Sequence, residues 1–220
     1  MVTFPARTFS GPRSKSFLLL APQPLTPLFE NLTRLDSLLK EHGTPWALVG
    51  GLAVGARTDP RFTRDIDLAV FVQDDADAER IIKFLLTNGY RLLAVLEQTA
   101  LSRLATVRLM PPDSERVADL LFASSGLELE IVRQAEMLEI APGYVVPVAR
   151  LAHLIAMKVL ARNDQKRPQD RLDLASLLSV ADENELDVCR DAIQLIVARG
   201  FHRGRPLLEE LENTLNELRD

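Results

Sequence analysis

A glycine pair followed at a fixed distance by two alternating aspartates is the feature that most constrains this chain. Thirteen residues separate Gly50-Gly51 from Asp65 and Asp67. The apolar segment 65–72 predicts a β-strand, in which side chains alternate between two faces. Asp65 and Asp67 therefore share one face, and the apolar residues around them occupy the other. Two like charges on one face need a counter-ion, and a divalent metal ion is the usual one.

The glycine pair predicts a tight turn that binds phosphate. It follows a short apolar strand, 46–49, and precedes a short helix, 52–57. Glycine lets the backbone approach a ligand closely, and the amides at the start of a helix hold a phosphate through oriented N–H groups and the helix dipole. Carboxylates on the next strand then hold one or two Mg²⁺ or Mn²⁺ ions, which stabilise the attacking and leaving oxygens of a displacement at phosphorus. The segment therefore predicts a site for a nucleoside triphosphate.

A third acid that completes such a metal site is Asp119. It is the lone acidic residue of the apolar segment 116–122. A buried acid without a partner is costly, so Asp119 either joins the first two acids or faces solvent on an edge strand. Beside that pair we favour the first interpretation, in which Asp65, Asp67 and Asp119 all bind metal.

Hydrophobic periodicity divides the chain into a mixed part and a helical part. The elements expected in the mixed part are helices over 25–42 and 75–88, strands over 91–95, 104–110 and 116–122, an ambiguous segment 128–134, and a β-pair formed by 137–140 and 145–148. The elements expected in the helical part are helices over 149–162, 168–180, 184–198 and 205–218. The fold class is therefore α+β, a mixed β-sheet flanked by helices and followed by a C-terminal helical region.

We expect three regions along the chain: an N-terminal arm over 1–23, a core over 24–148, and the helical region over 149–220, with the boundary near Pro147. The arm contains basic residues before a short apolar run, which is too short for a secretory signal peptide. No segment approaches the roughly 18 consecutive apolar residues of a membrane span. We therefore expect a cytoplasmic protein without membrane association.

Composition excludes several classes of site. The single cysteine, Cys189, excludes an internal disulfide and any multi-cysteine zinc site. A net charge of −5 gives no sign of a large nucleic-acid surface. Positive charge is nevertheless clustered beside the predicted site, at Arg57, Arg61 and Arg64 and again over 162–171. Any contact with RNA would therefore be local.

The order of these residues resembles the active-site pattern of the nucleotidyltransferase superfamily, which has the polymerase-beta-like fold. The resemblance covers about residues 46–122 and rests on Gly50-Gly51, Asp65-Ile66-Asp67 and Asp119. It implies a metal-dependent enzyme that moves a nucleoside monophosphate from a nucleoside triphosphate to an acceptor hydroxyl. The second glycine stands where many members carry serine, which removes a hydroxyl and keeps the turn.

The helical part is similar to the bacterial AbiEii/AbiGii-type toxin nucleotidyltransferases, in which one helix carries a lysine and the next an Asp-x-x-Asp-Leu segment. Here these are Lys158 and the run from Asp170 through Asp173 to Leu174. The resemblance implies that Lys158 reaches the nucleotide phosphates and that Asp173 or Asp170 orients it. It also implies an RNA acceptor, in particular a tRNA, and a separately encoded antitoxin protein.

These residues also have structural interpretations. Lys158 projects from the apolar row of its helix, where an ammonium group needs an anion, so an ion pair with Asp173 can simply join two helices. Asp170 suits a first helical turn through the dipole alone. Arg64 either contacts phosphate or compensates the charge of the neighbouring Asp65.

Other functions stay open on the same residues. The chain can be a catalytically silent, antitoxin-like binding module that keeps the fold, although all three acids are present. The acceptor can also be a small molecule, such as an aminoglycoside, or a protein side chain. A phosphotransferase would move the γ-phosphate, whereas a nucleotidyltransferase releases pyrophosphate.

Overall fold

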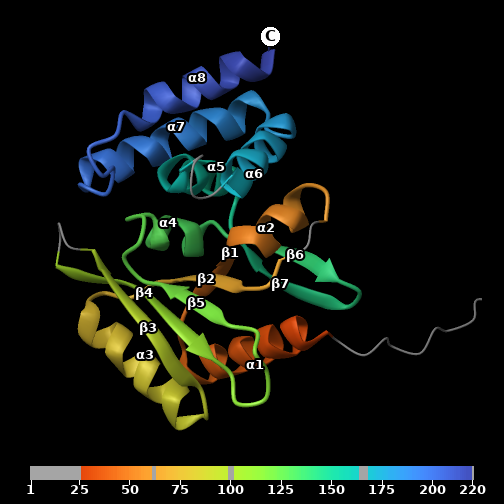
Figure 1. Ribbon diagram of the computed structural model, residues 1–220, viewed down its shortest axis with the longest axis vertical. Helices are drawn as coiled ribbons and strands as arrows, with labels where there is room; N and C mark the ends of the chain where they lie inside the picture. The colour runs from red at the N-terminus through yellow and green to blue at the C-terminus, as the bar shows by residue number, and fades with distance from the viewer. Residues whose placement is uncertain (1–25, 61–62, 99–101, 164–167, 220) are drawn as a thin grey trace, which may run out of the picture.

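The computed structural model describes residues 26–60, 63–98, 102–163 and 168–219. The arm predicted over 1–23 therefore lies outside the described residues. In the described part, a mixed seven-stranded sheet has helices on both faces, and a further group of helices stacks beyond one of them (Figure 1). The predicted α+β class is confirmed.

The sheet has the strand order β3-β4-β5-β2-β1-β7-β6. The strands are β1 (Trp46–Val49), β2 (Ile66–Val70), β3 (Arg91–Gln98), β4 (Arg103–Met110), β5 (Ala118–Leu121), β6 (Glu136–Ala141) and β7 (Tyr144–Val148). Neighbouring strands are parallel in the pairs β2–β5 and β1–β7 and antiparallel elsewhere. The strands β2 and β5, which carry predicted acids, therefore lie side by side near the middle of the sheet.

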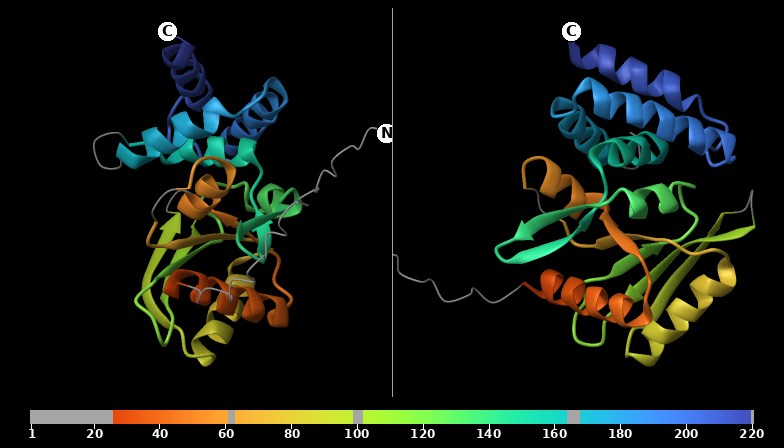
Figure 2. Two further views of the ribbon diagram at one scale, coloured as in Figure 1. Left: turned by 90° about the vertical axis from the view of Figure 1, so that its right-hand side faces the viewer. Right: turned by 180° about the vertical axis from the view of Figure 1, so that it is seen from behind.

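The helices form layers on the two faces of this sheet (Figures 1 and 2). The first face is covered by α1 (Pro27–His42) and α3 (Asp75–Thr87), and the second by α2 (Gly50–Arg57) and α4 (Glu128–Arg133). Beyond the second face lie α5 (Leu151–Ala161), α6 (Pro168–Ser179), α7 (Glu183–Ala198) and α8 (Leu207–Arg219). The helical part thus stands over the same face as α2.

Burial explains these positions. The alternating residues Ile66, Leu68 and Val70 of β2 are fully buried, as the period of a strand with one apolar face requires. Helix α5 is buried at eight of its eleven positions, which is typical of a helix surrounded by others. It packs against α6, α7 and α8 and also contacts α2. It is therefore the element that links the helical part to the sheet.

Most predicted elements are confirmed, and the differences are local. The aspartate strand covers Ile66–Val70 rather than 65–72, because the first inter-strand bond runs from the Ile66 amide to the Val117 carbonyl. Helix α2 begins at Gly50 itself rather than after the glycine pair. The ambiguous segment 128–134 is the short helix α4.

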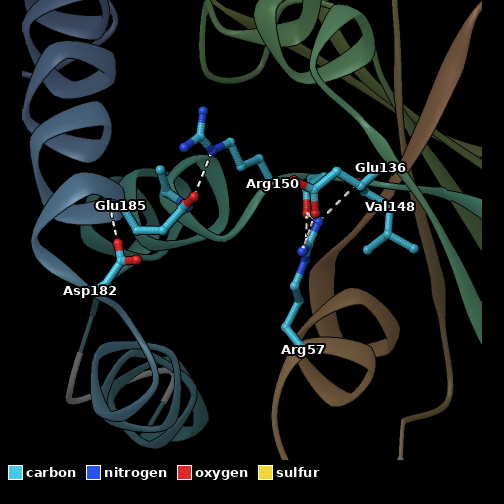
Figure 3. Close-up of polar contacts among 8 residues, drawn as sticks. Arg57, Glu136, Val148, Arg150, Asp182 and Glu185 are labelled. Carbon is cyan, nitrogen blue, oxygen red and sulfur yellow. Dashed lines mark hydrogen bonds and ion pairs between the residues drawn. The ribbon is translucent and has the colours of Figure 1, made fainter.

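Two arginines fix the chain between β7 and α5 (Figure 3). The Nε and Nη2 atoms of Arg57, at the end of α2, donate to the Ala149 carbonyl oxygen at 3.0 and 2.8 Å. The Nη1 atom of Arg57 lies 2.5 Å from the Glu136 carboxylate. On the other side, Arg150 donates to Glu185 of α7 at 2.7 Å. These contacts hold α5 in place relative to both α2 and α7.

The proposed boundary near Pro147 falls in β7, the strand that leads into α5. The division into a core over 24–148 and a helical region over 149–220 stays a prediction. Within the described part of the chain, no helix has the length and apolar character needed to cross a membrane.

Candidate active site

Four neighbouring strands place one residue each in a row across the sheet. The register sets Val49 of β1 opposite Asp67 of β2, Asp67 opposite Asp119 of β5, and Asp119 opposite Arg108 of β4. Directly opposed residues of neighbouring strands point to the same face. Asp67, Asp119 and Arg108 therefore project together on the face that α2 covers, and Asp65 lies one alternate position before Asp67. The alternative that places Asp119 on an edge strand is wrong, because β5 lies between β4 and β2.

Gly50 brings the start of α2 against the Asp67 carboxylate. Its φ of +63° is in the left-handed region, which glycine adopts without steric cost. A Cβ atom at this position would lie 2.0 Å from Oδ2 of Asp67. The first glycine of the pair is thus required twice, by its backbone conformation and by the space that the carboxylate fills.

Burial and neighbouring negative charge raise the pKa of Asp67 from 3.8 to about 6. Burial is the largest cause, followed by the Asp119 carboxylate, and Asp65 acts in the same direction. Lys158 and, to a smaller extent, Arg108 lower the pKa of Asp67, and neither outweighs burial or Asp119. The Asp67 carboxylate is therefore incompletely compensated, a condition that a bound cation relieves.

Arg108 contacts both oxygens of the Asp119 carboxylate. Its Nε donates to Oδ1 at 2.8 Å and its Nη2 to Oδ2 at 2.6 Å. The same Nη2 lies 3.6 Å from Oδ2 of Asp65. The Asp119 side chain is 13% exposed and that of Arg108 is 42% exposed. The hydrogen bonds to Asp119 raise the pKa of Arg108, so the guanidinium is a permanent cation at the rim of the acidic row.

Lys158 of α5 is held between two acids of α6. Its Nζ lies 2.7 Å from Oδ1 of Asp170 and 2.7 Å from Oδ2 of Asp173. The Gln169 side-chain amide donates to the other oxygen of Asp173 at 3.0 Å. The predicted contact of Lys158 with Asp173 is confirmed. The dipole alone does not account for Asp170, because its carboxylate is buried against this ammonium group.

These groups line a single cavity of about 340 Å³. Its walls include the glycine pair from α2, the acids of the sheet row, and residues of α5 and α6. The charged side chains around it are Arg64, Asp65, Asp67, Arg108, Asp119, Lys158 and Asp170. Asp173 is buried and is not part of the cavity wall, but it contacts Lys158, which is. The structure therefore brings together the residues that the sequence analysis singled out.

The donor set fits a divalent metal ion only after a rearrangement. Among the described residues, no three histidine, cysteine or acidic side chains are gathered closely enough to form a ready metal site. Three carboxylates nevertheless lie in adjacent positions of the sheet, and burial, followed by the charge of Asp119, raises the pKa of Asp67. Carboxylate oxygens are the ligands that Mg²⁺ and Mn²⁺ prefer. The chemistry of the acids fits, and both oxygens of Asp119 accept hydrogen bonds from Arg108 in the metal-free arrangement.

One residue of the site, Arg108, escaped the sequence analysis. It is the lone charged residue of the apolar segment 104–110, the same signal that singled out Asp119. Of the two interpretations of Asp170, the contact with Lys158 is the one that the structure has. Conversely, Arg57 is committed to the β7–α5 connection, and Arg61 lies outside the described residues.

The sequence model of the family described as "Nucleotidyl transferase AbiEii toxin, Type IV TA system" matches residues 35–220. The chain belongs to the AbiEii nucleotidyltransferase family. The match includes the glycine pair, the three acids and the Lys158–Asp170–Asp173 cluster. The resemblance inferred from the motifs is therefore confirmed, and the family supports transfer of a nucleotidyl group as the general activity.

Solved structures show the same fold. The solution structure of the antibiotic-resistance factor ANT(2'')-Ia matches with a TM-score of 0.52 and 19% identity, over 78% of this chain and 94% of that one. An antigenic nucleotidyltransferase-like protein from Paracoccidioides brasiliensis matches with a TM-score of 0.51 and 19% identity, over 84% and 92%. No protein with a curated description matches the chain in sequence.

Proposed function

We propose that this AbiEii family member is a Mg²⁺- or Mn²⁺-dependent enzyme that transfers a nucleoside monophosphate from a nucleoside triphosphate to an acceptor hydroxyl. The observation that carries the proposal is the convergence of three carboxylates, a helix start and a lysine on one cavity. The acceptor oxygen bonds to the α-phosphorus, the bond from that phosphorus to the bridging oxygen breaks, and pyrophosphate leaves. The acceptor hydroxyl gives up its proton.

Asp65, Asp67 and Asp119 are the proposed metal ligands. A bound divalent cation would neutralise charge on the phosphates and on the reacting oxygens. A cation would stabilise the ionised Asp67, whose pKa is raised to about 6 by burial and by the other acids. We also assign Asp119 the task of taking the acceptor proton, once its oxygens are no longer held by Arg108.

The phosphates would lie at the start of α2. Gly50 and Gly51 line the cavity at this point, and backbone amides at a helix start can bind phosphate oxygens. Lys158 also lines the cavity and is positioned by Asp170 and Asp173. We assign it the task of stabilising negative charge on the leaving pyrophosphate. Arg64, which also lines the cavity, is the proposed contact for an outer phosphate.

An RNA end, in particular that of a tRNA, is the proposed acceptor, and an antitoxin protein is the proposed partner. The family description as a toxin of a toxin–antitoxin system supports the antitoxin. The net charge of −5 agrees with an acceptor that is held at one end rather than along its length. These substrates place the proposed reaction in the cytoplasm.

A screen of acceptors tests the proposal. The purified protein is incubated with Mg²⁺ or Mn²⁺ and each of the four α-labelled nucleoside triphosphates. The acceptor is total RNA, a protein-free cell extract or an RNA-free cell extract, each in a separate reaction. We expect label in RNA, and none with the double variant Asp65→Ala, Asp67→Ala. Label in the small-molecule or protein fraction would replace the RNA acceptor, and no label in any fraction would support a catalytically silent binding module.

A further inference from the structure

The Asp119 carboxylate has a cationic partner where the proposed function requires a metal ligand. Both of its oxygens accept hydrogen bonds from Arg108, at 2.8 and 2.6 Å. A planar guanidinium that meets a carboxylate in this two-point geometry forms one of the stronger ion pairs in proteins. A cation beside Asp67 and the Arg108 guanidinium therefore compete for the same two oxygens of Asp119.

The pairing follows from the sheet and is not a chance surface contact. Arg108 and Asp119 are directly opposite in the antiparallel register of β4 and β5. The next residue of the row is Asp67. The guanidinium also reaches to 3.6 Å from Asp65, so one arginine lies within reach of two of the three acids. It therefore stands where positive charge is needed when no metal is bound.

The two side chains of the pair differ in exposure, so Arg108 can move into solvent more easily than Asp119 can. The Arg108 side chain is 42% exposed, whereas that of Asp119 is 13% exposed. The carboxylate is fixed by the sheet and the long arginine side chain opens toward solvent. A divalent cation that enters the acidic row meets Arg108 as a like charge at close range, which disfavours the simultaneous presence of both.

We propose that Arg108 is a positioning residue that holds Asp119 away from the metal site until a divalent cation displaces it, and so sets the affinity for that cation. The inference rests on the proposed function, because it assigns the acids to a metal. It makes metal entry an exchange, in which the Arg108–Asp119 ion pair opens as Asp119 joins Asp65 and Asp67. The cost of opening the pair weakens metal binding.

The test is the affinity of the nucleotide-free protein for Mn²⁺. The electron paramagnetic resonance signal of free Mn²⁺ measures how much of the ion is bound. We expect Arg108→Gln to bind Mn²⁺ on the order of tenfold more tightly than the wild type, which corresponds to about 1.4 kcal/mol. Arg108→Lys, which keeps the charge without the two-point geometry, should lie between them. The matched control is Arg103→Gln on the same strand, because Arg103 forms a comparable ion pair with Asp75 at 2.7 Å away from the cavity. Its Mn²⁺ affinity should equal that of the wild type.

A second readout uses the unmutated protein, so that it does not depend on the folding of a variant. The side-chain Nε–H resonance of Arg108 in ¹⁵N NMR should shift on addition of Mg²⁺, while that of Arg103 stays in place. Unchanged or weaker Mn²⁺ binding by Arg108→Gln, or an Arg108 resonance that ignores Mg²⁺, overturns the inference. If the wild type binds Mn²⁺ and Asp65→Ala, Asp67→Ala does not, the metal assignment stands whichever way the arginine result falls. If the wild type binds none, both the inference and the metal assignment fail.

Discussion

At the scale of single residues, the site keeps Asp67 in an unfavourable state. Its pKa is raised from 3.8 to about 6, chiefly by burial and then by Asp119. The folded protein therefore holds this proton more tightly than the unfolded chain. Stability from Asp67 is present below pH 3.8 and is lost as the pH rises through 6, so at neutral pH the ionised acid destabilises the metal-free protein.

Asp67→Asn should accordingly be more stable than the wild type at pH 7.5 in the presence of a chelator. The pKa values of 3.8 and about 6 set an upper bound of about 3 kcal/mol for the gain. Urea unfolding measures it. Asp74→Asn is the control, because asparagine can cap α3 as Asp74 does through its bond to the Asp77 amide. If Asp67→Asn is less stable than the wild type, the electrostatic account of Asp67 is wrong.

Gly50→Ala should lose nucleotidyl transfer and metal binding and destabilise the protein by more than about 1 kcal/mol. The left-handed backbone is strained by a side chain, and the new Cβ meets Asp67 Oδ2 at 2.0 Å. Gly143→Ala has a similar φ of +76° with open space around the Cβ. Gly143→Ala therefore separates backbone strain from the clash with Asp67, since it should lower stability through the backbone alone and keep activity. Equal activity in the two variants would contradict the close approach of α2 to Asp67.

Residue-level prediction from sequence was effective for acids and weak for their partners. Asp65, Asp67 and Asp119 stood out because charge is costly in an apolar strand, and alternation placed two of them on one face. Arg108 carries the same signal, but its partner is set by the β4–β5 register. That register depends on the path of the connection between the two strands, which the sequence does not specify.

At the scale of elements, Lys158 joins α5 to two acids of α6. Lys158→Met removes the ammonium group that lies 2.7 Å from both Asp170 and Asp173, whose side chains are only 10% and 1% exposed. Removing one partner of a buried ion pair typically costs about 3–5 kcal/mol, and we expect a loss of this size in urea unfolding. The control is Arg171→Met on α6, which breaks a contact of 3.8 Å with Glu217 between exposed side chains. It should lower the free energy of unfolding by less than about 1 kcal/mol. Similar losses in both variants would show that Lys158 is not a structural requirement of the helix pair.

Element boundaries were predicted best where the hydrophobic repeat continues over many residues. The helices of the C-terminal part were placed within a few residues, because their apolar positions repeat over several turns. Helix α4 has only six residues, and its start depends on Glu128, whose carboxylate accepts the amides of Ser124 and Ser125 at 2.9 and 2.8 Å. These bonds are local and do not depend on a repeat of apolar residues, so hydrophobic periodicity alone left the segment ambiguous.

At the scale of the whole molecule, the stability of the helical part should depend on pH through His153 of α5. Burial, and then Arg150, lower the pKa of this residue from 6.5 to about 4. The folded protein therefore keeps His153 neutral while the unfolded chain takes up a proton below pH 6.5. Stability from this group is complete above pH 6.5 and is lost as the pH falls through 4, by up to about 3 kcal/mol.

The measurement is urea unfolding between pH 4 and 7 in an Asp67→Asn background, because Asp67 titrates in the same range with the opposite sign. Adding His153→Leu should flatten the remaining pH dependence. His42→Gln, at an exposed position, should leave the dependence as it was. A slope that survives His153→Leu would assign it to other groups.

The assembly of the site is also a property of the whole chain. Motifs 46–122 supplied the acids and the glycine pair, and the family match extends over the helical part to residue 220. The sequence could not show how α5 is positioned beside the cavity. In the structure, Arg57 donates to the Ala149 carbonyl and Arg150 donates to Glu185, and these two contacts fix the connection between β7 and α5.

The central claim is that the acids and Lys158 support transfer of a nucleotidyl group, and the fate of the phosphates tests it most directly. The protein is given acceptor and nucleoside triphosphate labelled in parallel at the α- or the γ-phosphate. The account predicts α-label on the acceptor, γ-label in pyrophosphate at an equal molar amount, and loss of both with Asp65→Ala, Asp67→Ala. Label from the γ-phosphate on the acceptor, or undiminished transfer by the double variant, would contradict it.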